Sequence, residues 1–484
     1  MTMDRREFLK YAGALALAGT SPMQQAWTEG VSKNQRPNII VVLTDDLGYS
    51  DVGCFGTTLY ETPNIDRLAA SGMRFTQAYA ACPVCSPTRA SIMTGKYPAR
   101  LKLTDYLKGA KSPEDSPLRP APYADALALE EVTVAELLRG AGYTTGHVGK
   151  WHLGGKGYWP EDQGFDFNAG GCAIGQPKSY FWPQWGENPP IEGTSEGQYL
   201  ADRLTDIACG FIEKNRERPF FLNFCHYSVH MPLEAKPDKV AKYEAKLEAH
   251  PPQPGGQANA VYAAMVESVD ESIGRLMETL QRYGIADNTL VLFFSDNGGL
   301  SSLEGNQKFV PPTSNAPLRA GKGYLYEGGI REPLIVSWPS VINPGGVCDT
   351  PVCSIDFLPT FSAIGGVDPE KGGVHDLDGR NLGGLLRDPH ATFGRDALYW
   401  HFPHFSNSGG RPAGAVRAGD WKLIEFYETG QLELYNLKED LSEVHNLAEA
   451  EPDRTHQMLE QLRRWRKEVD ANMPLPNPAP VKHK

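Results

Sequence analysis

Residues 37–46 read Pro-Asn-Ile-Ile-Val-Val-Leu-Thr-Asp-Asp, an unbroken apolar run that ends in two carboxylates. A run of this length without polar alternation is typical of a strand that is buried on both faces of a sheet. Open α/β sheets place their ligand sites at the carboxyl ends of such strands. The stretch therefore predicts a central strand that delivers Asp45 and Asp46 to a functional site.

Helices and strands alternate after this first strand. Thr62-Pro63 and the capping box Thr133-Val-Ala-Glu136 each mark the start of a helix. Apolar residues recur on one face over residues 261–280, which predicts a long amphipathic helix. Further strands are expected at 143–150, 219–225 and 290–294. This alternation predicts an α/β fold, a large and mostly parallel sheet sandwiched by helices, over residues 36–390.

The pattern changes from about Asp396 onwards. Short strands are expected at 414–417, 421–426 and 431–436, where turn residues separate them, and a last helix is expected at 453–469. Residues 396–475 are therefore predicted to form a smaller α+β C-terminal subdomain.

Composition excludes several classes of protein. The 484 residues include 47 Lys and Arg against 59 Asp and Glu, which gives a net charge of −12. Hydrophobic residues make up 40% and charged residues 22%, as in an ordinary globular protein and unlike a disordered one. An acidic chain without basic runs is a poor nucleic-acid binder. Eight cysteines in so long a chain indicate scattered core thiols, not a disulfide framework.

The N-terminal segment has the pattern of an export signal. Arg5-Arg6-Glu-Phe-Leu-Lys10 precedes an apolar run of about eight residues, far short of the ~20 that a membrane-spanning helix needs. The segment resembles a bacterial twin-arginine signal, and an ordinary N-terminal helix is the alternative. We expect a signal peptide over residues 1–26, cleaved between Ala18 and Ala26, and export by the twin-arginine translocation machinery. The mature protein would be periplasmic or secreted, with no stable membrane anchor.

The segment Cys85-Ser-Pro-Thr-Arg-Ala-Ser-Ile-Met-Thr-Gly95 resembles the signature of the type I sulfatases, Cys-x-Pro-x-Arg followed by an apolar pair and Thr-Gly. Further motifs match in the family's order: Leu43-Thr-Asp-Asp46, Gly149-Lys-Trp-His-Leu-Gly154, Val229-His-Met-Pro232, Ser295-Asp-Asn-Gly298, and Gly321-Lys-Gly323 with Tyr326-Glu-Gly-Gly-Ile-Arg331. The resemblance implies an alkaline-phosphatase-like fold. It also implies that a formylglycine-generating maturation enzyme oxidises Cys85 to formylglycine.

The chemistry of sulfate transfer gives an independent reason for this modification. A serine that attacked a sulfate ester would become a serine sulfate, which is itself slow to hydrolyse. A hydrated aldehyde has two hydroxyls on one carbon, so that one attacks sulfur and the other then expels sulfate. Arg89 lies one helical turn after Cys85, and we expect its guanidinium to reach back and hold the formylglycine.

A metal site is expected where two predicted strands end. Asp45, Asp46, Asp296 and Asn297 form an all-oxygen set, which favours Ca²⁺ or Mg²⁺ over zinc, and residue 85 would add another oxygen. The resemblance implies Ca²⁺, with Mg²⁺ as the other candidate. Taken singly, these residues could equally be a strand-end turn and a hairpin turn.

The resemblance also implies four catalytic side chains. Lys150 and His152 would lie beside the formylglycine, with His152 as the base that releases sulfate. His230 and Lys322 would bind the sulfate, and one of the two would protonate the departing alcohol. A packed histidine and a solvated loop lysine are the alternatives for His230 and Lys322.

The substrate is less well defined by the sequence. His401, His404 and Arg411 lie among aromatic residues in a segment that looks like bacterial sulfatases acting on sulfated polysaccharides. Their side chains suit sugar recognition, although a domain interface is an equal alternative, and Trp182 and Trp185 could line a pocket instead. We expect a sulfatase that acts in the exo mode on a sulfated saccharide. The alternatives are a phosphatase or phosphonate hydrolase of the same superfamily, or a non-catalytic sulfated-glycan binding protein if Cys85 is not oxidised.

Overall fold

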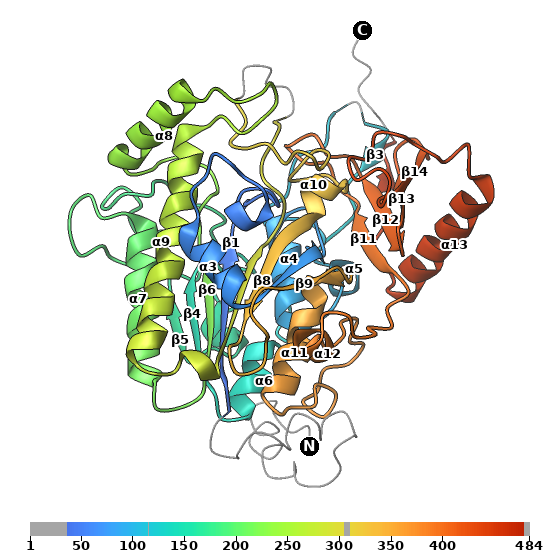
Figure 1. The fold of residues 1–484 in the computed structure, drawn as a ribbon. Coiled ribbons are helices and arrows are strands. Elements are labelled where there is room, and N and C mark those ends of the chain that lie inside the picture. Colours follow the sequence, from blue (N-terminus) through green and yellow to red (C-terminus); the bar gives the residue numbers. More distant parts are fainter. Residues whose placement is uncertain (1–35, 115, 304–309, 479–484) are drawn as a thin grey trace.

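The computed structural model describes residues 36–114, 116–303 and 310–478 (Figure 1). The predicted signal peptide, residues 1–26, lies outside the described residues. A nine-stranded sheet forms the centre of the larger part, in the order β10-β2-β8-β7-β1-β6-β4-β5, with β9 paired to β2. Its strands are β1 (Asn38–Thr44), β2 (Met73–Tyr79), β4 (Thr144–Gly149), β5 (Phe167–Ala169), β6 (Phe220–Cys225), β7 (Thr289–Ser295), β8 (Arg331–Ser337), β9 (Gly346–Cys348) and β10 (Val352–Cys353).

Most neighbouring strands of this sheet are parallel, as the sequence predicts. β1 pairs in parallel with β6 on one side and with β7 on the other, so the predicted first strand is central. β8 is antiparallel to both of its neighbours, β2 and β7. The four strands expected from apolar runs correspond to β1, β4, β6 and β7. The sequence did not predict β2 or β8.

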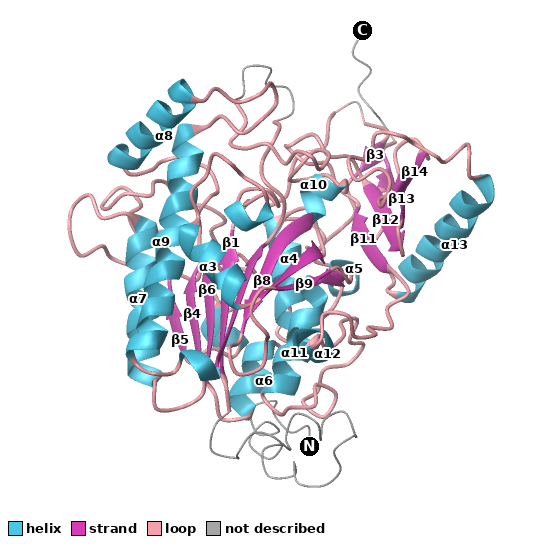
Figure 2. Cartoon of the chain, viewed as in Figure 1, coloured by secondary structure: helices cyan, strands magenta, loops and turns pink. Residues whose placement is uncertain are grey.

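Helices cover both faces of the sheet (Figure 2). They are α3 (Pro63–Ser71), α4 (Cys85–Thr94), α5 (Pro98–Leu101), α6 (Val134–Gly140), α7 (Leu200–Asn215), α8 (Pro237–Ala249), α9 (Ala260–Arg282), α10 (Glu327–Ile330), α11 (Phe357–Ile364) and α12 (Gly383–Arg387). Ile40 and Val42 of β1 pack into the core under α7 and α9. Ile39 and Val41 pack into the opposite core, with α4, α6 and α11. Successive strand residues point to opposite faces, so a strand covered on both faces is typically apolar along most of its length.

A second sheet forms the smaller part of the molecule, at the right of Figure 1. Its antiparallel strands are β11 (Leu398–Phe402), β12 (Ala413–Ala418), β13 (Trp421–Phe426) and β14 (Leu432–Asn436), and α13 (Pro452–Glu468) packs against them. β3 (Leu118–Arg119) pairs with β15 (Leu475–Pro476) in a short ribbon. The three predicted short strands and the last helix are present, and β11 is an additional strand that the sequence analysis did not identify.

The two parts share a buried interface. Tyr97, which precedes α5, packs its ring against Trp465 of α13 with the centroids 5.2 Å apart. Lys422 of β13 is fully buried and lies 2.9 Å from carboxylate oxygens of both Glu327 and Glu443. A buried ion pair of this kind is costly to break, because the remaining charge is left in a medium of low polarity. The smaller part is therefore firmly fixed on the larger one.

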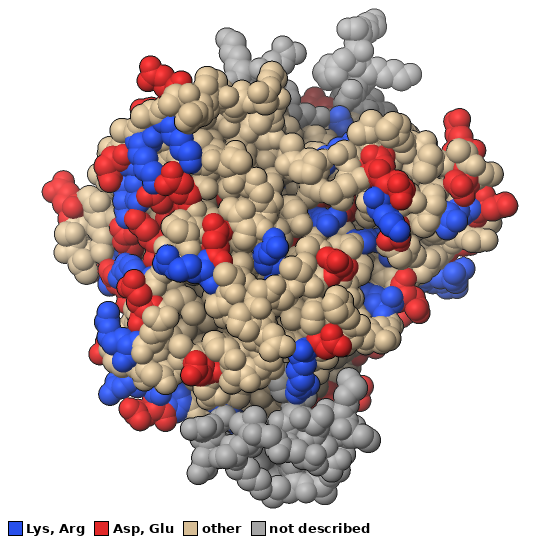
Figure 3. All heavy atoms as spheres, viewed as in Figure 1, with Lys and Arg blue, Asp and Glu red and all other residues tan. Residues whose placement is uncertain are grey.

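The molecular surface carries both signs of charge. Figure 3 shows acidic and basic side chains interspersed on the viewed face. None of the helices in the described ranges is both long and apolar enough to cross a membrane. The eight cysteines are free thiols, and six of them are buried.

Candidate active site

The ends of two central strands bring four oxygen-bearing side chains together. Asp45 and Asp46 follow β1, and Asp296 and Asn297 follow β7, whose Ser295 is in register with Thr44 of β1. The backbone N–H of Asp46 donates to Asp296 Oδ1 at 3.3 Å, and Asn297 Nδ2 donates to Asp46 Oδ1 at 2.8 Å. All four residues are buried. The predicted cluster thus forms because parallel neighbours end at the same edge of the sheet.

Cationic side chains pair with these carboxylates. Lys150, which follows β4, donates from Nζ to Asp45 Oδ2 at 2.7 Å. Arg89 of α4 donates from Nε to Asp296 Oδ2 at 2.8 Å, and its Nη1 donates to the carbonyl of Lys150 at 2.9 Å. These hydrogen bonds of Arg89 do not go to residue 85, contrary to the expectation from the sequence. The guanidinium instead ties α4 to the ends of β7 and β4.

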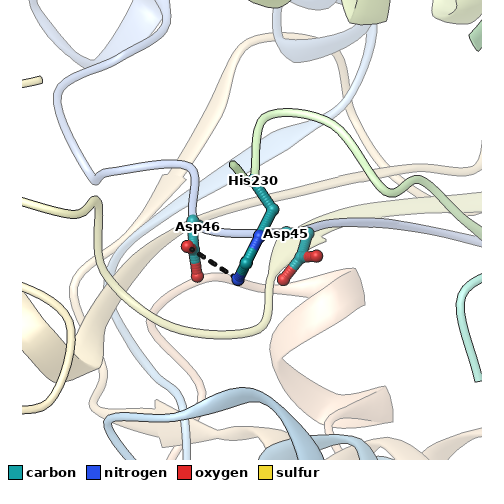
Figure 4. Close-up of side chains that lie close together, drawn as sticks. All are labelled: Asp45, Asp46 and His230. Carbon is teal, nitrogen blue, oxygen red and sulfur yellow. Dashed lines mark ion pairs between the residues drawn. The ribbon is translucent and has the colours of Figure 1, made fainter. Parts of the chain in front are cut away.

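Lys322 and His230 approach the same cluster from two loops. Lys322 Nζ lies 2.7 and 2.8 Å from the two carboxylate oxygens of Asp46. His230 Nε2 lies 3.6 Å from Asp46 Oδ2 (Figure 4). Its Nδ1 is 2.9 Å from the carbonyl of Met231. A carbonyl only accepts, so Nδ1 of His230 carries a proton. Both side chains thus lie beside Asp46, where they could bind an anion close to the four oxygen-bearing residues.

Cys85 is the first residue of α4 and is 2% exposed. Its Sγ lies 3.3 Å from Nδ1 of His152, whose Nε2 is 2.6 Å from the carbonyl oxygen of Leu107. Nε2 must donate to that carbonyl, which leaves the lone pair of Nδ1 facing residue 85. His152 adopts a left-handed backbone with φ 59°. A non-glycine residue held in that conformation is often part of a functional site.

Burial and charge together set the protonation states of the site. Burial, helped by Lys150, lowers the pKa of His152 well below its usual value. Burial and Lys322 lower the pKa of His230 to about 3. Burial lowers the pKa of Lys322, but Asp46 and residue 85 outweigh it and hold the pKa above its usual value. At neutral pH both histidines are therefore neutral and the lysine is charged.

The oxygen cluster fits a divalent cation. Asp45 Oδ1 and Asn297 Oδ1 are buried and have no hydrogen-bond partner among the residues that the structure describes. Burial raises the pKa of Asp45 well above its usual value, against the effect of Lys150, and Asp296 and Asp46 raise it further. Orphaned buried acceptors beside repelling carboxylates indicate a place for a cation. Figure 4 shows Asp45, Asp46 and His230 around this place, where one ligand atom of each lies within 4.8 Å of the others.

The three predicted sugar-reading residues lie in different environments. His401 is buried, and its ring nitrogens bond the Tyr427 hydroxyl and the Asn472 carbonyl, each at 2.7 Å. His404 is fully buried, and its Nε2 bonds the Thr104 hydroxyl at 2.8 Å. Neither ring presents an atom to a saccharide. Arg411 is exposed, with its guanidinium 5.6 Å from the centre of the Phe405 ring.

The alternative aromatic residues are part of a packed loop. Trp185 is fully buried and donates from Nε1 to the carbonyl of Ile191 at 2.9 Å. Trp182 is half-buried and its ring centroid is 5.2 Å from that of Trp185. The loop-packing interpretation therefore fits Trp185, and Trp182 packs against it.

Comparisons with known proteins agree with this geometry. The family model described as Sulfatase matches residues 37–367, and the one described as N-sulphoglucosamine sulphohydrolase, C-terminal, matches residues 320–469. The chain is 32% identical to a sulfatase of Formosa agariphila, over 96% of this chain and 94% of that one. It is 30% identical to arylsulfatase A of Homo sapiens, over 92% and 90%. The chain belongs to the sulfatase family.

Solved structures of sulfatases share the fold. The crystal structure of Ps i-CgsB in complex with k-i-k-neocarrahexaose has a TM-score of 0.73 at 30% identity, and the match covers 89% of this chain and 93% of that one. The alkaline-phosphatase-like fold implied by the sequence motifs is thus confirmed. The protein is a sulfuric ester hydrolase.

Several residues that support this sulfatase site were not identified from the sequence. Leu107 contributes only its backbone carbonyl to His152, and no side-chain pattern indicates such a role. Gly175 lies against the His152 ring, so that an added Cβ would be 2.6 Å from Cε1. Tyr180 donates its hydroxyl to the carbonyls of Tyr227 and His230, at 2.6 and 2.9 Å. These contacts join segments that are far apart in the sequence, and no local motif marks them.

Proposed function

We propose that this sulfatase hydrolyses sulfate esters of a carbohydrate with a formylglycine derived from Cys85 and with Ca²⁺. The contact between Cys85 Sγ and His152 Nδ1, at 3.3 Å and beside the oxygen cluster, carries the proposal. The hydrated aldehyde, when present, supplies a nucleophilic hydroxyl and a second hydroxyl whose deprotonation releases sulfate. A thiol at this buried position could act as a nucleophile, but it has no second group on the same carbon that could release the sulfate.

His152 is proposed as the base. Its Nδ1 faces residue 85 and its Nε2 proton is engaged with Leu107, so the ring is neutral and can accept a proton at Nδ1. Lys150 lies two residues earlier, and its ammonium on Asp45 keeps positive charge beside the reacting group. A negative charge at residue 85 is stabilised by that cation and by the N-terminus of α4.

Lys322 and His230 are proposed to bind the sulfate group. The ammonium of Lys322 lies on Asp46, whereas the Nδ1 proton of His230 is engaged by the Met231 carbonyl, so we assign protonation of the departing alcohol to Lys322. In the neutral ring Nε2, the nitrogen that faces Asp46, only accepts hydrogen bonds, so His230 donates to a sulfate oxygen only when a second proton is bound there. Of the two side chains considered as the acid, His230 and Lys322, we therefore propose Lys322.

The proposed cation is held by Asp45, Asp46, Asp296 and Asn297. Carboxylate and amide oxygens are the ligands that Ca²⁺ prefers, and Mg²⁺ is the other candidate. Such an ion supplies Lewis-acid stabilisation of the sulfate charge and lowers the pKa of a bound hydroxyl. Asp46 also bonds Lys322, so the same carboxylate links the cation site to the sulfate-binding lysine.

A substitution at residue 85 tests the nucleophile. Cys85→Ala should fold normally and lose essentially all turnover of 4-nitrophenyl sulfate. Cys209→Ala, which removes a half-buried thiol on α7, should keep full activity. The peptide mass at residue 85 measures conversion of the wild type. Substantial turnover by Cys85→Ala would refute the mechanism, and an unconverted, inactive wild type that still binds sulfated glycans would favour the non-catalytic alternative.

The substrate is proposed to be a sulfated saccharide whose sulfate ester is hydrolysed in the exo mode. The loop of residues 406–411 lies against the loop that carries Lys322, since Ser302 bonds the carbonyl of Ser408 and a Cβ at Gly410 would collide with the carbonyl of Gly323. Ps i-CgsB, a neighbour with 30% identity, is in complex with k-i-k-neocarrahexaose, which supports a carbohydrate substrate. We retain exposed Arg411 as the sugar contact, and we do not assign a sugar contact to His401 or His404, whose buried rings bond other residues of the protein.

Paired substrates test this assignment. Arg411→Ala should lower kcat/KM on sulfated saccharides by about tenfold to a thousandfold, and should change turnover of 4-nitrophenyl sulfate much less. An equal loss of kcat/KM on both substrates would show that Arg411 supports the sulfate-hydrolysing site and does not contact the sugar.

Export through the twin-arginine machinery and maturation by a formylglycine-generating enzyme complete the proposal. Replacing Arg5 and Arg6 together by lysine should leave folded protein in the cytoplasm. If that variant still reaches the periplasm, the twin-arginine interpretation is wrong.

A further inference from the structure

The catalytic histidine is oriented by a backbone carbonyl in a loop. Residues 104–107 lie between α5 and β3, outside any helix or strand, and Leu107 of this loop accepts the hydrogen bond from His152 Nε2 at 2.6 Å. That bond selects which nitrogen of His152 is protonated, and thereby directs the lone pair of Nδ1 towards residue 85. A loop carbonyl can do this only if the loop itself is held in place.

Side chains on two sides of the loop bond it, in addition to the contact of Cys82 Sγ with the Thr104 carbonyl. On the catalytic side, the backbone N–H of Leu107 donates to Ser86 Oγ at 3.2 Å, so the second residue of α4 fixes one end. On the other side, Nε2 of His404 bonds Thr104 Oγ1 at 2.8 Å, and Nδ1 of His404 lies 3.9 Å from Asp105 Oδ2. The ring is fully buried, so solvent does not compete for the hydrogen bond with Thr104, whereas Nδ1 has no hydrogen-bond partner among the described residues.

His404 belongs to the smaller part of the molecule. It follows β11, whose pairing with β12 fixes its position: Phe402 is in register with Ala413. The neighbouring Pro403 accepts a backbone hydrogen bond from Ala121 at 3.4 Å, which adds a contact between the same two parts. The second sheet thus reaches the catalytic loop through one buried imidazole.

We infer that His404 is a positioning residue of the sulfatase reaction, which acts through Thr104 and the Leu107 carbonyl to orient the base His152. The smaller part of the molecule then contributes to the chemical step itself and not only to contact with the substrate. This inference rests on the proposed role of His152. It predicts that loosening the His404–Thr104 contact disorients His152 without altering the sulfate-binding side chains.

The test removes the hydroxyl of Thr104 and keeps its shape. Thr104→Val should lower kcat for 4-nitrophenyl sulfate by about ten- to a hundredfold with KM nearly unchanged, as expected when the partner of a catalytic group is lost. Thr104→Ser, which retains the hydroxyl, should restore kcat. His404→Gln places an amide nitrogen near the position of Nε2 and should keep more activity than His404→Leu. Nitrogen chemical shifts of labelled His152 should report a mixed tautomer in Thr104→Val and a single tautomer in the wild type.

Thr455→Val is the matched control. Thr455 is a buried threonine of α13 whose hydroxyl bonds the Ala448 carbonyl at 3.1 Å, far from His152 in the chain. It should lower the Tm as Thr104→Val does and leave kcat unchanged. A kcat of Thr104→Val within twofold of the wild type, or an equal fall in Thr455→Val, would overturn the inference. Full activity of His152→Ala would instead refute the proposed role of His152 as the base. Failure of the inference about His404 can therefore be distinguished from failure of the proposed function.

Discussion

Gly175 offers a direct way to displace His152, the proposed base, without changing any of the proposed catalytic side chains. An added Cβ at this position would lie 2.6 Å from Cε1 of His152, 2.9 Å from Nε2 and 3.1 Å from Nδ1. The backbone of Gly175 is not in the left-handed region, so alanine is allowed there. The collision therefore falls on the imidazole ring and not on the loop's own conformation.

The size of the effect follows from these distances. Non-bonded carbon atoms are comfortable at about 3.5 Å, so the ring must move by roughly 1 Å to accommodate the methyl group. Leu107 holds Nε2 at 2.6 Å, and a shift of the ring changes both this bond and the distance of Nδ1 from residue 85. A displacement of about 1 Å costs on the order of a hundredfold in rate, or about 2.7 kcal/mol.

We expect Gly175→Ala to lower kcat for 4-nitrophenyl sulfate about a hundredfold, with KM and Tm nearly unchanged and with residue 85 converted as in the wild type. Steady-state kinetics, a thermal melt and the peptide mass measure these four quantities. Gly155→Ala is the control, because a Cβ there meets no atom within 4 Å. Wild-type kcat in Gly175→Ala would show that His152 is not the base or that its ring position does not matter.

Three further predictions concern the supports of the site. Tyr180→Phe removes the hydroxyl that bonds the carbonyls of Tyr227 and His230. It should lower kcat/KM about tenfold and the free energy of unfolding by about 1–2 kcal/mol. Unchanged kinetics would show that Tyr180 does not support the position of His230. Removing divalent ions with a chelator should abolish turnover and lower the Tm, and Ca²⁺ or Mg²⁺ should restore both better than Zn²⁺; rescue by zinc alone would refute the oxygen site. Burial, opposed by Lys422, raises the pKa of Glu443 above its usual 4.5, so its contribution to stability is complete below pH 4.5 and is lost as the pH rises through the raised pKa. Urea unfolding should show stability that declines as the pH rises above 4.5 in the wild type, and a flatter profile in Glu443→Gln; parallel profiles would contradict the raised pKa.

Local patterns in the sequence were enough to predict the main strands and the composition of the site. A strand covered on both faces is apolar along most of its length, and residues 39–43 form such an unbroken apolar run without help from the rest of the chain. Asp45, Asp46, Asp296 and Asn297 could be placed together because each pair directly follows a predicted parallel strand. β2 and β8, which pair antiparallel with each other, were not predicted, because the local sequence carries no signal for the direction or the partner of a strand.

The sequence by itself determined which chemical groups enter the site, because strand ends and ordered motifs are local properties. Only the tertiary structure decided how those groups are oriented. Arg89 turns to Asp296, 207 positions away, and His404 turns inward to Thr104, 300 positions away. Such partners are chosen by the burial of polar atoms, which must find a hydrogen bond wherever the fold brings one. Periodicity and spacing describe only neighbours along the chain, so they could not reveal which nitrogen of His152 faces Cys85.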